Sequence, residues 1–521
     1  MHPALYITEL LTAILPAADS WSPEKRRTAA AMASTCRAFY EPATNFLWEE
    51  LPYVEPLLDC LAGAHGIDSP PSTDGASGLA VGKWACFFTH ATRVKVLHVE
   101  LKEYPSYSDE ASKSVDDRKY EDIEEQLSTL VLIHTLSESP IFPKLHTVVV
   151  TDYFFAPRWS YASYVPFFMG PEVRRVKVEA LGHATTQALS QLTLSCPQLR
   201  QLELDYVFDS DIKLLRCYQA LEEALCSHHQ CPVGLPMALA QLGSLRRASL
   251  RFPPEFAGLG KSGGQSILFP NLESLKLYDF PSISILPDFI QSIGSTRLTS
   301  LTVEDLGWVS NDTTPFDQTI AALAKFPMLR ELILEGTDHT PLHVLDRSVF
   351  PPLPPPKLHL LEELTISLPD VFHVETQTIP ELGKAWPSLR RLDVRTKYKT
   401  YGHEDPPRVW TLDALDLCAA HLPNLQYLDM DFDTSTIRSL PPPSSRSLSH
   451  ITIYTAFTQV DEQDVALIAA YISSIYPNAH VLFEHIWWGG EDDPDVRRWI
   501  DIGRAVAKAR GNDGPATSIE H

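Results

Sequence analysis

The residues best suited to chemistry lie in LLRCYQALEEALCSHHQCPVG, which holds Cys217, Cys226, His228, His229 and Cys231 within fifteen positions. Thiolates and imidazoles are the ligands that zinc prefers, so this segment is a candidate metal site. Zinc sites usually carry paired ligands about two to four residues apart on both sides of a longer loop, whereas one side here is a single cysteine. A helix followed by a polar loop is therefore the favoured interpretation, and zinc binding stays an alternative.

Two other segments resemble ligand loops only in part. In GLGKSGGQS, residues 258–266, the first glycine of a phosphate loop would fall at Glu255, so a flexible surface loop is favoured. DMDFDTS, residues 429–435, has the spacing of the first calcium ligands, but Thr434 and Leu440 replace the glycine and the final glutamate of an EF-hand. No catalytic Ser/His/Asp order or carboxylate pair stands out. We therefore predict no catalytic residue, no metal and no cofactor, and a protein that is not an enzyme.

Composition narrows the class of partner. The 521 residues carry a formal charge of -23, which argues against nucleic acid and anionic membranes, because both are bound mainly by Lys and Arg. Eight cysteines are sparse and lie mostly in apolar runs, so they indicate reduced thiols in the cytoplasm or the nucleus. No apolar run reaches the roughly 18 residues of a membrane span. The apolar N-terminus follows Glu9 and no Lys or Arg, so a signal peptide is disfavoured.

The elements that would position any site come from a repeat that starts near residue 94. Each copy has an apolar residue, two variable residues, a second apolar residue, one variable residue and a third apolar residue. About thirteen copies occur, mostly 23 to 36 residues apart. The clear copies begin at Leu199, Leu272, Leu329, Leu389 and Leu425, and the weaker ones at Val94, Leu145, Val173, Leu245, Leu298, Leu361, Leu448 and Ala479.

One copy displays the physics of a repeat unit. Residues 317–326 place apolar side chains on one helical face, a proline ends the helix, and Leu332 and Leu334 then alternate with Glu331 and Glu335 as in a half-buried strand. A doubly wound α/β sheet also alternates helices and strands, but it rarely repeats one spacing so often. The predicted fold class is α/β, a solenoid with a curved parallel sheet on its concave face and helices on its convex face.

This region resembles the leucine-rich repeats of cytosolic ligase receptors, over about four-fifths of the chain. The resemblance implies that the array binds a protein substrate. Outward strand residues are the candidates, and their alternating blocks of charge suit a protein partner. The predicted target-binding residues on the concave face are Arg175, Lys177, Arg247, Arg251, Lys276, Tyr278, Glu331, Glu335, Arg391, Arg395, Tyr427 and Asp429.

The first fifty residues show three short helical patterns: YITELLTAILP, SPEKRRTAAAMAS and TCRAFYEPATNFLWEEL, the last broken near Glu41–Pro42. The block resembles an F-box of the short form that precedes leucine-rich repeats in many fungal receptors. The residues that carry the resemblance are Pro3, Leu5, Leu10, Leu11, Ile14, Cys36, Arg37, Phe39, Leu47, Trp48 and Leu51. It implies docking on the Skp-family adaptor of a cullin-based ubiquitin ligase, through Pro3, Leu5, Leu10, Leu11, Ile14, Leu47 and Trp48. For Trp48, sealing the F-box against the first repeat is an equal alternative.

The expected organisation is an F-box-like domain at 1–52, a connecting segment at 53–90, the repeats at 91–486, a capping helix at 487–510 and a disordered tail at 511–521. Insertions are expected at about 101–125 and 206–240. The predicted function is the substrate-recognition subunit of an SCF-type ubiquitin ligase, with an unknown protein substrate. The alternative is a leucine-rich-repeat scaffold without ligase coupling.

Overall fold

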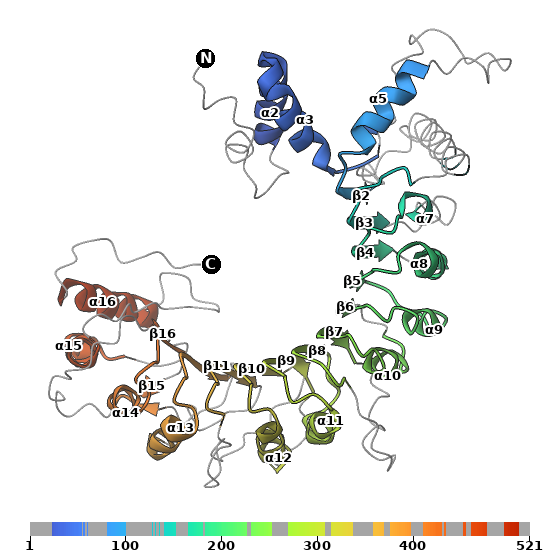
Figure 1. Cartoon of the computed structure of the whole chain (residues 1–521). Helices are drawn as coiled ribbons and strands as arrows, with labels where there is room; N and C mark the ends of the chain where they lie inside the picture. Colours follow the sequence, from blue (N-terminus) through green and yellow to red (C-terminus); the bar gives the residue numbers. More distant parts are fainter. Residues whose placement is uncertain are drawn as a thin grey trace, which may run out of the picture. The chain divides into compact units, whose positions relative to one another are not determined.

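The computed structural model describes about three fifths of the chain, divided into two compact units, Met1–Leu245 (unit 1) and Arg246–His521 (unit 2) (Figure 1). The described residues are 23–54, 56–57, 60, 81–100, 128, 131, 135, 140–152, 165–180, 183–226, 231–252, 269–307, 314–336, 358–368, 376–396, 410–429, 432–433, 452–454, 460–476 and 494–509.

Unit 1 opens with two packed helices, α2 (Pro23–Thr35) and α3 (Arg37–Glu49). Ala29 and Ala43 are fully buried where the helices meet, and around them pack the partly buried Met32, Ala33, Phe46 and Leu47. The expected break near Pro42 is wrong, because α3 runs through it. Proline in a helix forfeits one backbone hydrogen bond, and Pro42 is buried, so the area that it removes from water opposes the loss.

The strands of unit 1 are all parallel and follow one another in chain order. They are β1 (Glu50–Leu51), β2 (Val96–Glu100), β3 (Thr147–Asp152), β4 (Arg175–Ala180), β5 (Gln201–Leu204) and β6 (Glu223–Cys226). Figure 1 shows the helices α7, α8, α9 and α10 along one side of the sheet. The helices that follow α3 are α5 (Val81–Ala91), α7 (Val165–Phe168), α8 (His183–Ser195), α9 (Ile212–Leu215) and α10 (Leu235–Ala240).

Unit 2 repeats this arrangement with a second run of parallel strands in chain order. Its strands are β7 (Arg247–Arg251), β8 (Ser274–Tyr278), β9 (Ser300–Leu306), β10 (Glu331–Gly336), β11 (Glu363–Leu368), β12 (Arg391–Thr396), β14 (Tyr427–Asp429) and β16 (Thr452–Tyr454), with β13 (Trp410–Thr411) and β15 (Phe432–Asp433) paired separately. Its helices are η4 (Ile283–Ile285), α11 (Leu286–Ser292), α12 (Thr314–Ala322), η5 (Leu323–Lys325), η6 (Thr376–Thr378), α13 (Ile379–Ala385), α14 (Asp413–His421), η7 (Glu462–Asp464), α15 (Val465–Ile475) and α16 (Pro494–Ala509).

Each repeat uses its apolar spacing in the same way. The first apolar residue of the pattern is buried and the strand begins two positions later, as at Leu329 and β10. The backbone carbonyl of Arg330 accepts hydrogen bonds from the backbone N–H groups of both Glu362 and Glu363, at 2.7 and 2.9 Å, which sets the register of the next strand. Leu332 and Leu334 are buried and face Leu364 and Ile366 of β11. The predicted α/β solenoid of leucine-rich repeats is confirmed.

Residues 206–240, expected to be an insertion, hold a further repeat instead. Leu221 is fully buried, and β6 begins two residues later and pairs with β5. Ala224 and Cys226 occupy the two core positions that leucine takes elsewhere. The step of 46 residues from Leu199 to Leu245 is therefore two ordinary steps of 22 and 24 residues (221 − 199 and 245 − 221). Because its core residues are small, this repeat does not match a pattern defined by leucine.

The end of the N-terminal helical block is itself a strand of the sheet. Trp48 stands two residues before β1, as Leu329 does before β10, and Glu50 and Leu51 pair with Val96 and Leu97 of β2. The backbone carbonyl of Glu49 accepts from the backbone N–H of Lys95 at 2.7 Å, the same contact that links later repeats. The helices therefore continue into the solenoid with no separate linker.

At the C-terminal end, α16 packs against α15 and buries Trp499, Ile502 and Val506, spaced as one helical face. Within the described part of the chain, no helix combines the length and apolar character needed to cross a membrane. Several predicted features lie outside the described residues: the 101–125 insertion, the glycine-rich loop at 258–266 and the tail at 511–521.

Candidate functional site

The candidate site is the face of each sheet that the helices leave uncovered, here called the open face (Figure 1). On β4, Val176 and Val178 are buried while Arg175, Lys177 and Glu179 alternate with them on the open face. The same alternation holds on β5 and β6. Most of the predicted target-binding residues therefore share one surface within each unit, as period-two alternation requires.

On the open face of unit 1, the cations are bound by acids on the same or the next strand. Lys177 Nζ lies 2.6 Å from Glu179 Oε1 and 2.8 Å from Glu203 Oε1. Burial disfavours the ammonium, but the hydrogen bonds to the two glutamates outweigh it and raise the pKa of Lys177. Arg175 is held more loosely, with Nη2 3.9 Å from Glu203 Oε2. The predicted blocks of charge are thus largely neutralised between neighbouring strands.

Negative charge nevertheless exceeds positive charge here. Asp205, at the end of β5, has its pKa raised by burial and then by the charges of Glu179 and Glu203, while Lys177 opposes the rise. Burial is the larger cause of this rise, and the charges of the two neighbouring glutamates add a locally negative potential. The carboxyl-terminal ends of β4 and β5 therefore form an acidic part of the open face.

A shallow depression of about 110 Å³ lies beside this acidic part. Its lining comes from β4, β5 and β6 and consists of Arg175, Val176, Gln201, Leu202, Glu203, Glu223 and Leu225. Gln201 Nε2 donates to Glu223 Oε2 at 2.9 Å. Sequence reasoning missed Glu223 and Leu225 because the repeat that carries them was taken for an insertion.

The open face of unit 2 repeats the cross-strand pairing. Arg251 on β7 forms an ion pair with Asp279, which follows β8. Lys276 Nζ lies 2.7 Å from Glu304 Oε1 and 4.8 Å from the ring centroid of Tyr278. These predicted target-binding residues are brought together in one part of the unit, and their cations are already engaged by the chain itself.

Further along unit 2, the polar residues lie deeper. The guanidinium of Arg391 lies 4.6 Å from the ring centroid of Tyr427, and its Nη2 lies 3.8 Å from Asp393 Oδ2. Asp393 is 0 % exposed, and Asp429, opposite it in register, is 4 % exposed. The expectation that Asp429 is an accessible outward residue is therefore wrong. The alternation of apolar residues places both aspartates on the open face and does not encode their burial.

The remaining predicted target-binding residues are spread over other strands of unit 2. Arg247 is exposed on β7, and Glu331 and Glu335 are half-buried on β10. Ser300 Oγ donates to Glu331 at 2.8 Å. Arg395 belongs to β12, and its side chain lies outside the described part of the structure.

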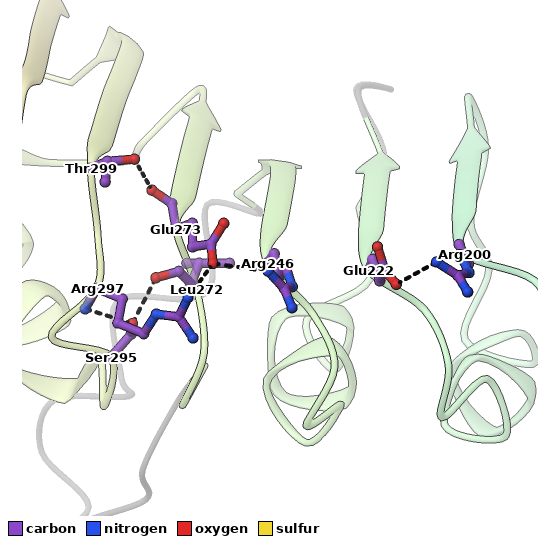
Figure 2. A network of polar contacts seen from close by, with 8 residues as sticks. All are labelled: Arg200, Glu222, Arg246, Leu272, Glu273, Ser295, Arg297 and Thr299. Carbon is purple, nitrogen blue, oxygen red and sulfur yellow. Dashed lines mark hydrogen bonds and ion pairs between the residues drawn. The ribbon is translucent and has the colours of Figure 1, made fainter.

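A second polar feature is a row of arginines and glutamates just before the strands, here called the charge row (Figure 2). In unit 1, Arg200 Nη1 lies 3.3 Å from Glu222 Oε1. In unit 2, Glu273 Oε1 bridges Arg246 at 3.3 Å and Arg297 at 2.8 Å. The same pattern recurs where Arg330 and Arg390 both contact Glu362. Such half-exposed pairs each contribute about 0–1 kcal/mol to stability. The main effect of the charge row is therefore to place opposite charges next to each other in neighbouring repeats.

The backbone before the unit 2 strands is braced by hydroxyls that Figure 2 also shows. Ser295 Oγ is fully buried and donates to the backbone carbonyl of Leu272 at 2.6 Å. Thr299 Oγ1 donates to the carbonyl of Glu273 at 2.8 Å. The carbonyl of Glu273 also accepts from the backbone N–H groups of Thr299 and Ser300, so the hydroxyl adds a further bond to the contact that joins β8 and β9.

The N-terminal helical block is joined to the first repeats by side chains as well as by β1. Arg93 bonds to Glu41 and Asn45 of α3, in both cases at 2.9 Å. Lys95 Nζ lies 2.7 Å from Glu49 Oε1. These contacts fix α3 against the turn that enters β2.

An aromatic stack completes this junction. The rings of Trp48 and His90 are nearly parallel, with centroids 4.1 Å apart. Arg26 of α2 donates to the backbone carbonyls of Leu47 in α3 and Glu50 in β1. Trp48 therefore does contact the start of the repeat array. Pro3, Leu5, Leu10, Leu11 and Ile14 lie outside the described residues, and Leu47 is half-buried against the α2–α3 core.

The His90 stack predicts a pH effect on stability. Burial lowers the pKa of His90, the charge of Arg93 lowers it further, and Glu41 partly opposes both. The unfolded chain then binds the proton more readily, so the contribution of neutral His90 is complete above the unfolded-chain pKa of about 6.5 and is lost as the pH falls from there through the lowered pKa of the folded chain. His90→Phe keeps an aromatic stack and removes the titration. Between about pH 7.5 and 5.5, the unmodified chain should lose more thermal stability than this variant, measured by the melting midpoint.

The control for this prediction is His359→Gln, because His359 lies on an exposed turn before β11. It should lose stability on acidification as the unmodified chain does. Equal acid sensitivity of the unmodified chain and His90→Phe would contradict the role assigned to His90.

The cysteine-rich segment does not assemble a site in the described residues. Cys226 is a core residue of β6, and burial, followed by the charge of Cys231, raises the pKa of its thiol. Cys217 is exposed after α9, while His228 and His229 lie outside the described residues. Among the described residues, no group of three or more His, Cys, Asp or Glu is placed to hold a metal ion. A repeat strand, β6, forms where the expected helix would continue, and residues 227–230 of the expected polar loop lie outside the described residues.

The chain matches no protein-family model and no curated protein. Among solved structures, it is similar to TLR13 in a complex with ssRNA13, at 12 % identity and a TM-score of 0.31, over 76 % of this chain and 62 % of that chain. It is also similar to the Toll–Spatzle complex of Drosophila, at 14 % identity and a TM-score of 0.36, over 75 % of this chain and 47 % of that chain. The match covers less than two thirds of the length of either neighbour's chain. The repeated helix–strand units in register define this protein as a leucine-rich-repeat solenoid.

Proposed function

We propose that this protein is the substrate-recognition subunit of an SCF-type ubiquitin ligase. In this proposal the N-terminal helices dock on a Skp-family adaptor and through it on a cullin, and the open face of the repeats binds a protein target in the cytoplasm or the nucleus. The ubiquitin transfer itself belongs to other subunits.

The observation that supports this proposal is the form of the N-terminal block. Among the described residues of this block, 23–54, the core that α2 and α3 share has Ala29 and Ala43 as its fully buried apolar residues, which is little for a domain that must stand alone. The block leads through β1 straight into the sheet, so a partner bound to it would be held at a set place relative to the open face of unit 1. A rigid connection of this kind suits a receptor that presents its target to a ligase.

The second candidate is a leucine-rich-repeat scaffold without ligase coupling, and the Trp48–His90 stack favours it. Trp48 carries part of the resemblance to an F-box, yet its ring is engaged within the chain. An aromatic residue at such a junction buries area whether or not a partner binds.

Co-purification with the Skp adaptor separates the two candidates. We expect the unmodified full-length chain to retain the adaptor and Ile14→Asp to weaken binding by about thirtyfold or more, the size of an interface hot spot. Leu194→Asp is the matched control, because Leu194 is 81 % exposed on α8, away from α2 and α3 in the sequence. Loss of the adaptor by Ile14→Asp but not by Leu194→Asp supports the receptor. If the unmodified chain binds no adaptor, the receptor proposal is overturned and the scaffold without ligase coupling is the candidate that remains.

A further inference from the structure

The depression on the open face of unit 1 combines an aliphatic platform with carboxylates. Leu225 lies on the open side of β6 and is half-buried, with Glu203 opposite it in register on β5. Glu223 stands two residues earlier on the same strand and lines the same hollow. One aliphatic surface and two carboxylates therefore meet in a space that one extended side chain can enter.

The charges around this hollow favour a cation. Four acids, Glu179, Glu203, Asp205 and Glu223, lie on β4 to β6 or at their ends, against the two cations Arg175 and Lys177. Lys177 is bound closely between Glu179 and Glu203. This arrangement shows how the open face binds an ammonium group, with a carboxylate from each of two adjacent strands in contact with it.

Arg175 is the side chain that an incoming cation would displace. It lines the hollow, its side chain is 52 % exposed, and its contact with Glu203 is long at 3.9 Å. A contact of that length between half-exposed groups is weak. The geometry thus leaves a loosely held arginine above an aliphatic platform and two acids.

We propose that this depression binds a lysine or arginine side chain from an extended segment of the protein partner. The aliphatic stem lies on Leu225 and the cationic head contacts Glu223 and Glu203, because long basic side chains place their stems on apolar surface and their charge on acids. The proposal rests on the proposed function in that the open face binds a protein target. It adds the chemistry of that target: a basic segment rather than an acidic one.

The test measures binding of a fluorescein-labelled tetra-arginine peptide to the purified full-length chain at low ionic strength, by fluorescence anisotropy. Glu223→Gln should weaken binding about threefold to fivefold. The matched control is Glu222→Gln, which changes the net charge equally at the adjacent residue. Glu222 lies in the charge row with Arg200 and does not line the depression (Figure 2). Its effect should be clearly smaller.

Two further pairs of variants test the platform and the displaced arginine. Leu225→Ala should weaken binding about twofold to fivefold, whereas Val149→Ala, an open-face aliphatic change on β3, should not. Arg175→Gln should strengthen binding, because it removes the competing cation, and should do so more than Arg174→Gln outside the depression. An increase in affinity cannot arise from a variant that fails to fold.

Equal effects of Glu222→Gln and Glu223→Gln, or of Arg174→Gln and Arg175→Gln, would show attraction to the net charge only and would overturn the proposal. Tighter binding of a tetra-glutamate peptide than of tetra-arginine, or no binding of either, would overturn it as well. The measurement uses the chain without the adaptor. Failure to bind the adaptor therefore leaves this result standing, and failure here leaves the ligase proposal to its own test.

Discussion

Phe280→Ala is expected to lower the free energy of unfolding of unit 2 by about 3–5 kcal/mol. Phe280 follows β8 and packs with Phe252, which follows β7, and with Phe289 of α11. The three ring centroids lie 5.0 to 5.7 Å apart, and all three side chains are buried. Removing the central ring leaves a cavity between two repeats and a helix, and the two parallel strands limit how far it can collapse.

Hydrogen exchange of peptides from unit 2 measures this loss without assuming that the whole chain unfolds in one step. Phe280→Leu, which refills most of the volume, should cost about 1 kcal/mol. Met328→Ala is the exposed control in the same unit, and its effect should stay within about 0.5 kcal/mol. A cost for Phe280→Ala no larger than that of Met328→Ala would contradict the packing role of the cluster.

Gly383→Ala is expected to destabilise unit 2 by about 3 kcal/mol. Helix propensity alone would predict the opposite, because alanine favours a helix more than glycine does. Gly383 lies inside α13, where alanine is normally about 1 kcal/mol better than glycine. A methyl group there would collide with the carbonyl oxygen of His421 at the end of α14 and would lie 2.9 Å from its carbonyl carbon. Both neighbours are backbone, so α13 and α14 must separate to admit it.

Gly243→Ala is the matched control, because a methyl group there meets nothing within 4 Å. That change should be neutral or stabilise by about 0.4–1 kcal/mol through the unfolded chain. Hydrogen exchange in α13 and α14 should increase for Gly383→Ala. Unchanged or slower exchange there would mean that propensity outweighs the close approach of the helices.

The repeat array could be predicted from local apolar spacing because every unit obeys the same two constraints. The first apolar residue of a copy is buried under the turn, and the next two point from the strand to the core, so Leu329, Leu332 and Leu334 encode their strand without reference to the remainder of the chain. The same reasoning failed at Leu221. Alanine and cysteine satisfy the core of β6 as small apolar residues, and a pattern written for leucine does not detect them.

The sequence was enough to locate the open face, but it was not enough to predict which side chains on that face contact each other. Alternation places Lys177 and Lys276 on that face from the sequence. Their partners Glu203 and Glu304 lie 26 and 28 residues later, and the register of the next strand decides that they meet (203 − 177 and 304 − 276). The burial of Asp393 and Asp429 is likewise a property of the packed chain.

The sequence by itself therefore determined the solenoid, the side of each strand that faces the core, and the presence of a helical block before the repeats. These features depend on periodicity within a few residues, which a linear chain displays directly. The tertiary structure decided that the Leu-Trp end of that block is also the first strand, that the supposed insertion is a repeat, and which charges lie together. Those features depend on pairing between residues far apart in the chain, which hydrogen-bonded register and packing set and local patterns do not.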